Sequence, residues 1–250
     1  MHKSRKELKL QARRALLGRY PAAVGITFVA VCSMLAMLVV LFLGTLLLGG
    51  AMMNVMGEDV GAVTMLVGFY LDCMLLTLFY AMLFPGISRF YLNICQGRPA
   101  GVGDLLWGFR YPGGKFWGIG LRLVAIEFVT TILSVFLTAT AFFIDAEYYA
   151  NLFVVIYNLL WSAGFIYLIL TYGLFYFVLA DNPGLSMGEA LRESRKLMSG
   201  NRWRITLLAF SFLGLAFVSY LTMGMGSLWL WPYICCSFCC FYLDLRRAKA

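Results

Sequence analysis

The sequence predicts an all-α integral membrane protein with six transmembrane helices in three hairpins. First, 62% of its 250 residues are hydrophobic and only 13% are charged, whereas soluble chains are about half apolar and a quarter charged. Second, six apolar runs have close to the ~20 residues that a membrane-spanning helix needs. Third, all but one of the 20 Lys and Arg residues fall in segments on one side of these spans.

The spans follow one another in a single membrane domain, residues 1–250. Their boundaries follow from the apolar runs between polar or charged segments. The spans are expected at residues 21–48, 62–84 (continuing past Pro85 at an angle to residue 92), 116–143, 151–180, 203–221 and 227–245.

The distribution of charge predicts the orientation of these spans. Basic residues precede the first span, follow the second and the fourth, and end the chain, whereas the other connections hold only Glu58, Asp59, Asp145 and Glu147. Cytoplasmic segments are the ones that retain Lys and Arg, so both termini are predicted to be cytoplasmic. The partner expected for the net charge of +8 is the anionic inner leaflet rather than nucleic acid. The basic residues expected to face lipid or a protein partner are Arg13, Arg14, Arg195, Lys196, Arg202 and Arg204.

Aromatic residues lie near the predicted ends of the spans, where Trp and Tyr are favoured. An alternative is that they are simply abundant, at 16% of the chain. Tyr148, Tyr149, Trp229 and Trp231 are expected at the outer interface, and Trp107, Trp117, Trp203 and Tyr242 at the inner one.

Three similar units are visible along the chain, at roughly residues 1–97, 98–183 and 184–250. ARRALLGRYPAAVGITF from Ala12 resembles SRKLMSGNRWRITLLAF from Ser194, and DLLWGFRYPGGKFWGIG from Asp104 is a looser match. Even-numbered spans end alike, in FYLNICQG, FVLADNPG and FYLDLRRA. Each unit is interpreted as a cytoplasmic amphipathic helix followed by a hairpin, the alternative being chance similarity.

The amphipathic helix is clearest in the last unit. Ser186 and Glu189 have the spacing of a capping box, one helical face is apolar, and Gly200 is placed to end the helix. Such a helix can lie in the headgroup plane, dock onto a partner, or act as a linker that holds the hairpins in register.

Ionisable residues inside the spans are the main candidates for function. Asp72 and Glu127 are expected near the membrane midplane, and Arg122 nearer the cytoplasm with Asp72 as its partner. They form either an ion-coupled pathway or an internal ion pair with one protonated carboxyl. Asn158 is expected to form an interhelical hydrogen bond.

No catalytic, metal or cofactor site is predicted. The CCSFCC run from Cys235 to Cys240 lies in an apolar span, where thiols stay neutral and pack as small hydrophobes. Lipidation and redox sensing are the alternatives. The chain has one histidine and lacks HExxH, GxSxG and P-loop motifs, so independent catalysis is not expected.

From Ser194 onward the chain resembles an uncharacterised bacterial membrane family, domain of unknown function 975. Leu215 and Met225 depart from the Trp and Ile expected there. The resemblance implies a multi-pass protein of the bacterial plasma membrane and implies no activity. A more distant likeness is to the membrane domain of some glycerophosphodiester phosphodiesterases, whose catalytic domain is absent. The residues that carry the main likeness are Ser194, Leu197, Met198, Gly200, Leu221, Thr222, Gly224, Gly226, Pro232, Tyr233, Phe241 and Tyr242.

Two functions are therefore compatible with the sequence. The first is a non-enzymatic module that organises lipid through its basic surface, or that scaffolds or regulates a partner. That partner is either another protein or a second copy of the chain. The second is a small transporter or permease subunit in which Asp72 and Glu127 line a path and Arg122 is the counter-charge.

Overall fold

A computed structural model describes residues 3–111, 114–143 and 147–249, so the prediction for Asp145 lies outside the described residues, as do those for the side chains of Glu147, Tyr148 and Tyr149. Within these ranges every regular element is a helix. The helices are α1 (Arg5–Leu16), α2 (Tyr20–Met56), α3 (Glu58–Cys95), α4 (Val102–Leu105), α5 (Trp107–Arg110), α6 (Lys115–Phe143), α7 (Glu147–Tyr172), α8 (Phe175–Asp181), α9 (Met187–Met198), α10 (Arg202–Phe210), α11 (Leu213–Leu221) and α12 (Ser227–Lys249).

Six helical stretches of the described chain are long and apolar enough to cross a membrane. They are Tyr20–Met56, Glu58–Cys95, Lys115–Leu133, Val155–Asp181, Arg202–Leu221 and Ser227–Ala248. The prediction of an all-α chain with six such stretches is therefore confirmed.

Two of the predicted spans are interrupted. The fourth is divided between α7 and α8 at Gly173, where an added Cβ would lie 2.6 Å from the Ile169 carbonyl oxygen. The fifth is divided between α10 and α11, where the Ser211 hydroxyl donates a 2.6 Å hydrogen bond to the Leu208 carbonyl. Such bonds compete with the helical ladder and bend helices.

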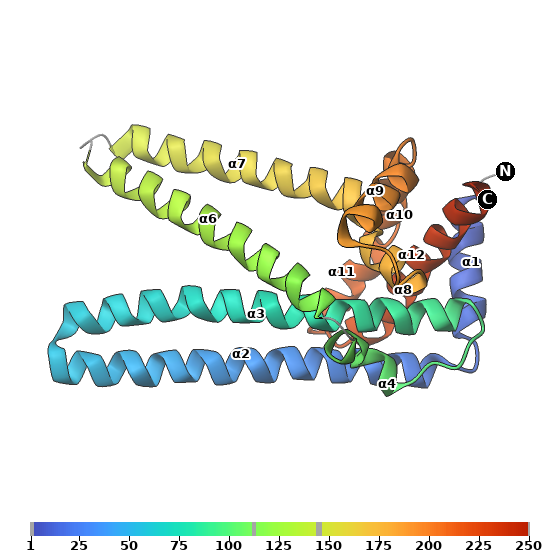
Figure 1. The fold of residues 1–250 in the computed structure, drawn as a ribbon, viewed down its shortest axis with the longest axis horizontal. Coiled ribbons are helices and arrows are strands. Elements are labelled where there is room, and N and C mark those ends of the chain that lie inside the picture. Colours follow the sequence, from blue (N-terminus) through green and yellow to red (C-terminus); the bar gives the residue numbers. More distant parts are fainter. Residues whose placement is uncertain (1–2, 112–113, 144–146, 250) are drawn as a thin grey trace.

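The two long hairpins and the last three helices occupy different parts of the molecule. In Figure 1, α2 with α3 and α6 with α7 extend to the left, whereas α10, α11 and α12 lie in the right half of the molecule, which also contains both chain termini. Helix α2 has 37 residues and is about 55 Å long, nearly twice the hydrocarbon thickness of about 30 Å.

Buried side chains are concentrated near the termini, in a region that we call the core end. The buried residues of α2 are Ala23, Ile26, Thr27 and Ala30 in its first third, with Gly49 alone farther along. The core end also contains buried side chains of α1, α8, α9 and α12. The hairpin tips expose long rows of apolar side chains, as membrane-embedded helices do.

Helices α1 and α9 repeat the same local structure. Each begins with a capping box, formed by Ser4 with Glu7 and by Ser186 with Glu189. Each is followed by a glycine with positive φ, +74° at Gly18 and +78° at Gly200. The other unit has the short helices α4 and α5 instead. The division into three units stays a prediction.

Candidate functional site

The structure does not pair the intramembrane charges as expected. The Asp72 carboxylate accepts a 2.8 Å hydrogen bond from the Thr45 hydroxyl on α2. Arg122, two turns into α6, is exposed and directs Nη1 to the Met187 Sδ at 2.6 Å. The structure therefore does not bring Asp72 and Arg122 together, because the long Arg side chain reaches toward α9 at the core end instead of into the hairpins.

Glu127 and Asn158 lie on the second hairpin. Glu127 has one buried carboxylate oxygen, Oε2, that has no hydrogen-bond partner among the described residues. Asn158 is exposed on α7 and does interact with another residue. The prediction that these residues form one polar cluster with Asp72 remains a prediction.

The predicted basic residues all lie at the core end. Arg13, Arg14, Arg195 and Lys196 are exposed there. The Arg13 guanidinium lies 5.4 Å from the centre of the Tyr233 ring, and the Arg202 guanidinium lies 5.2 Å from that of Tyr167. Both arginines cover aromatic faces of neighbouring helices. Arg13 remains exposed, whereas Arg202 is partly buried, with its Nε fully covered.

Arg204 joins the two ends of the chain. Its guanidinium donates to the Asn201 side chain at 2.9 Å, to the Lys3 carbonyl at 2.9 Å, and to the Asp244 carboxylate at 3.0 Å. The backbone N–H of Lys3 donates to the same carboxylate at 3.2 Å. The segment before α1 is thereby attached to α10 and α12.

Most residues of the sequence motif have structural roles at the core end. Ser194 and Met198 are fully buried on α9. Gly224 has a φ of +83° in the turn before α12, a conformation that favours glycine. The Thr222 hydroxyl accepts a 3.0 Å hydrogen bond from the Gly226 backbone N–H in the same turn. Pro232 lies inside α12, where Tyr233 packs against Phe212.

Asp181 forms a second network that the sequence analysis did not identify. Its carboxylate accepts a 2.8 Å hydrogen bond from the Tyr242 hydroxyl and forms an ion pair with Arg246. Gln96 donates to the other oxygen at 3.5 Å. The signal was present in the sequence, because these residues lie in the three similar segments that end the even-numbered spans.

Basic residues at the starts of the two long hairpins donate hydrogen bonds to backbone carbonyls. Arg19 donates to the Arg98 and Gly97 carbonyls at 2.9 and 3.2 Å, just beyond the end of α3. Lys115 donates to the Pro183 carbonyl at 2.9 Å and also to that of Leu185. These carbonyls lie in the loops that follow α3 and α8, so the two cations hold those loops against the starts of the hairpins.

Two ionisable groups outside the apolar helices have shifted pKa values. Burial, followed by the nearby charges of Arg13 and Arg5, lowers the pKa of Lys9. The Lys9 ammonium lies 4.1 Å from the centre of the Phe212 ring and donates to the Ser211 carbonyl at 2.9 Å. Hydrogen bonds from Ser186 lower the pKa of Glu189.

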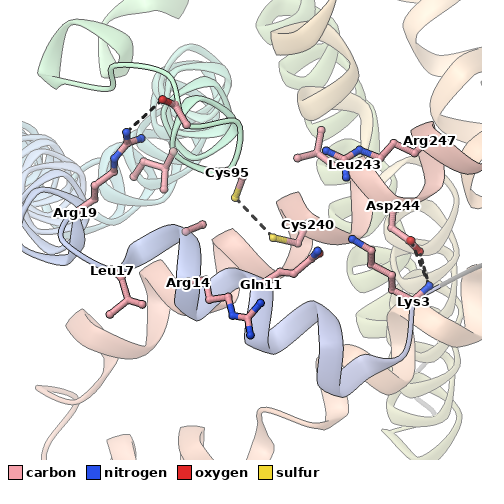
Figure 2. A pocket seen from close by; sticks show the side chains of 13 residues that line it. Lys3, Gln11, Arg14, Leu17, Arg19, Cys95, Cys240, Leu243, Asp244 and Arg247 are labelled. Atoms are coloured by element: carbon pink, nitrogen blue, oxygen red, sulfur yellow. Dashed lines mark hydrogen bonds between the residues drawn. The ribbon is translucent and has the colours of Figure 1, made fainter.

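A cavity of about 510 Å³ opens between α1, α12 and the end of α3. Figure 2 shows basic side chains from both ends of the chain around it. Among the described residues that line it, Asp244 is the only acidic one, and it pairs with Arg204. The polar lining residues are Lys3, Gln11, Arg14, Arg19, Asp244 and Arg247.

Two cysteines form part of the wall of this cavity. The Cys240 thiol lies 3.9 Å from the Cys95 sulfur, as Figure 2 shows. Cys236 and Cys239 are fully buried on α12. Within the described residues no group of His, Cys, Asp or Glu has an arrangement that could hold a metal ion. The burial supports a packing role for the run from Cys235 to Cys240.

One contact contradicts the predicted positions of two aromatic residues. The Tyr20 hydroxyl at the start of α2 donates a 2.7 Å hydrogen bond to the Trp229 carbonyl at the start of α12. Trp231 shares a small cavity with Ala30 and Met34 of α2. The predicted spans place Trp229 at the outer interface, across the membrane from Tyr20. The two residues are instead in contact, because α12 packs beside the first third of α2.

Comparisons with known proteins give one match. A family model described as "Protein of unknown function (DUF975)" matches residues 1–249. No curated protein and no solved structure matches the chain. The more distant likeness to a phosphodiesterase membrane domain stays a prediction.

Proposed function

We propose a function for this chain, which belongs to the DUF975 family of proteins of unknown function. It is a non-enzymatic membrane module whose basic core end organises anionic lipid, or a partner bound there. The observation that carries the proposal is the separation of charge. Helix α2 has no charged residue from Tyr20 to Met56, and the first basic residue of α3 is Arg89, near its end at the core end. The exposed cations lie at the core end, where an anionic leaflet would attract them.

The proposed orientation places the core end at the cytoplasmic face of a bacterial plasma membrane. Both termini are then cytoplasmic, and α1 and α9 lie near the headgroups. Exposed Arg13, Arg14, Arg195 and Lys196 support this orientation, because cytoplasmic segments retain basic residues.

We further propose that only the first two hairpins cross the membrane fully. Trp231 of α12 lies beside Met34, and α2 continues from there to Met56, a distance of about 33 Å. That distance is close to a whole hydrocarbon layer of about 30 Å. The hairpin formed by α10, α11 and α12 would therefore enter from the cytoplasmic side and return without reaching the outer surface.

Lipid selectivity tests the proposed function. In reconstituted membranes, spin-labelled phosphatidylglycerol should associate with the protein more strongly than phosphatidylcholine, and added salt should weaken this preference. The double variant Arg195→Gln, Lys196→Gln should reduce the preference. The control Asn54→Asp, Val55→Asp changes the net charge by the same amount at the tip of the first hairpin. This control should leave the preference for phosphatidylglycerol unchanged. Equal association of both lipids with the unsubstituted protein would refute the proposal.

The transporter alternative has one observation in its favour, the buried Glu127 oxygen without a described partner. If this carboxyl carries a proton across the membrane, Glu127→Gln and Asp72→Asn should abolish proton flux into dye-loaded liposomes while the fold persists. If the lipid-organising function is correct, neither variant changes lipid selectivity.

A further inference from the structure

We propose that the cavity between α1, α12 and the end of α3 binds a phosphate group, carried either by a lipid headgroup or by a soluble phosphorylated molecule. The lipid source rests on the proposed function, because it requires the core end to face the membrane surface. The phosphate site itself does not.

The charge of the lining favours an anion. Four cations, Lys3, Arg14, Arg19 and Arg247, surround the cavity. The one carboxylate in the described part of the lining, Asp244, is in an ion pair with Arg204 and accepts the Lys3 backbone N–H. The wall therefore has an excess of positive charge that an anion can neutralise.

Three of these cations have free donors. Within residues 3–111, 114–143 and 147–249, the side chains of Lys3, Arg14 and Arg247 form no ion pair and no hydrogen bond. Arginine binds phosphate through two parallel N–H groups, and lysine binds it as a point charge. These donors are the ones that a phosphate with several oxygen acceptors requires.

The fourth cation is held in place by the fold. Two hydrogen bonds from Arg19 to the Arg98 and Gly97 carbonyls fix its guanidinium at the wall. Guanidinium has five N–H donors, so donors remain for a ligand. A fixed cation loses little side-chain entropy when an anion binds.

The size and surroundings of the cavity suit a headgroup. Its volume of about 510 Å³ lies within the range of small-molecule sites, about 300–1,000 Å³. Leu17, which is 75% exposed, lines both this cavity and an apolar groove beside Val218 and Leu230. A lipid could place its phosphate in the cavity and an acyl chain in this groove, whereas a soluble phosphate would use the cavity alone.

The experiment measures binding to the full chain in detergent micelles. Dioleoyl phosphatidic acid, inorganic pyrophosphate and dioleoyl phosphatidylcholine are each titrated, and binding is followed by native mass spectrometry and by the shift in unfolding temperature. The test variant is Arg14→Gln, Arg247→Gln, and the matched control is Arg5→Gln, Lys6→Gln, which removes two exposed cations of α1 outside the cavity.

The expected result is saturable binding of phosphatidic acid that the test variant weakens by at least about tenfold, the effect of losing one charge-assisted hydrogen bond. The control should bind like the unsubstituted protein. If phosphatidic acid binds and pyrophosphate does not, the ligand is a lipid. If both bind, the phosphate group alone is sufficient for binding.

Two results would overturn the site. One is equal weakening by the test and control variants, which would mean that net charge alone attracts the anion. The other is no saturable binding of either anion. If the preference for phosphatidylglycerol in membranes persisted in that case, the proposed function would stand without this cavity.

Discussion

The Tyr20 hydroxyl and the Trp229 carbonyl are joined by a hydrogen bond of 2.7 Å. This bond connects the first turn of α2 with the first turn of α12, although the residues are 209 positions apart. The start of α12 in the last hairpin therefore lies beside the start of α2 in the first hairpin. The contact therefore has consequences for both stability and topology.

Tyr20→Phe removes this bond and leaves the Trp229 carbonyl without it. The variant should lower the free energy of unfolding by about 1 kcal/mol, the usual net value of one hydrogen bond. Thermal unfolding in detergent provides the measurement. Tyr220→Phe is the control because that side chain is 79% exposed, and equal stability of both variants would contradict the prediction.

Labelling from outside distinguishes a full crossing of the third hairpin from a partial one. A membrane-impermeant maleimide should react with Glu58→Cys on intact cells and should not react with Met223→Cys. Arg195→Cys should react only after permeabilisation. Met223 is 97% exposed, so the fold itself does not hide it. Labelling of Met223→Cys to the same extent as Glu58→Cys would show that the third hairpin crosses the membrane.

Asp244→Asn removes the acidic partner of Arg204. The Asp244 side chain is only 6% exposed, so its interactions are poorly replaced by water. The free energy of unfolding should fall by about 2 kcal/mol, typical of hydrogen bonds to charged groups. Chemical denaturation can measure the change. Glu58→Gln, at the tip of the first hairpin, should leave the denaturation midpoint unchanged, and an equal effect would disprove a specific role of Asp244.

Gly200→Ala tests the turn that follows α9. Its φ of +78° costs an alanine about 1–2 kcal/mol, so the unfolding temperature should fall. Gly188→Ala is the matched control, because an added Cβ there meets no atom within 4 Å and alanine favours helix. The prediction fails if both substitutions have the same effect.

Acid should loosen the first turn of α9. The Ser186 side chain, and then its backbone N–H, lower the pKa of Glu189 in the folded protein. Stabilisation by this carboxylate is therefore complete above the unfolded pKa of about 4.3 and is lost as the pH falls through the lower folded pKa.

Hydrogen exchange, corrected for its intrinsic pH dependence, measures this effect. Amide protection at the start of α9 should be constant from about pH 7 to about pH 5 and should fall below about pH 4. Glu189→Gln should lose this dependence, because glutamine accepts the same bonds without titrating. An unchanged pH dependence in this variant would assign the transition to another group.

Much of the secondary structure could be predicted because it follows from local patterns. Residues 116–143 were expected as the third span, and α6 is Lys115–Phe143. The capping box of Ser186 and Glu189 also forms as expected. In contrast, α2 continues to Met56 rather than residue 48, because Gly49 and Gly50 do not end a helix in an apolar run.

The site was harder to predict because its residues come from opposite ends of the chain. The basic character of Arg14 was evident, but its proximity to Lys3 and Arg247 depends on how α1 packs against α12. The failed pairing of Arg122 has a similar cause, since only the fold places Met187 within its reach. Sequence patterns determine which face of a helix is apolar and do not determine which helix it will meet.

Because its buried side chains are concentrated at one end, the two parts of this protein have different surroundings. At the core end, side chains such as Leu16, Tyr91 and Phe241 are covered by other protein groups, and their contacts are the same in a bilayer or in a micelle. The outer two thirds of α2 and α3 are covered largely by whatever surrounds them. Replacing lipid with detergent therefore changes the environment of the hairpin tips, while an unfolding transition continues to measure the cohesion of the core end.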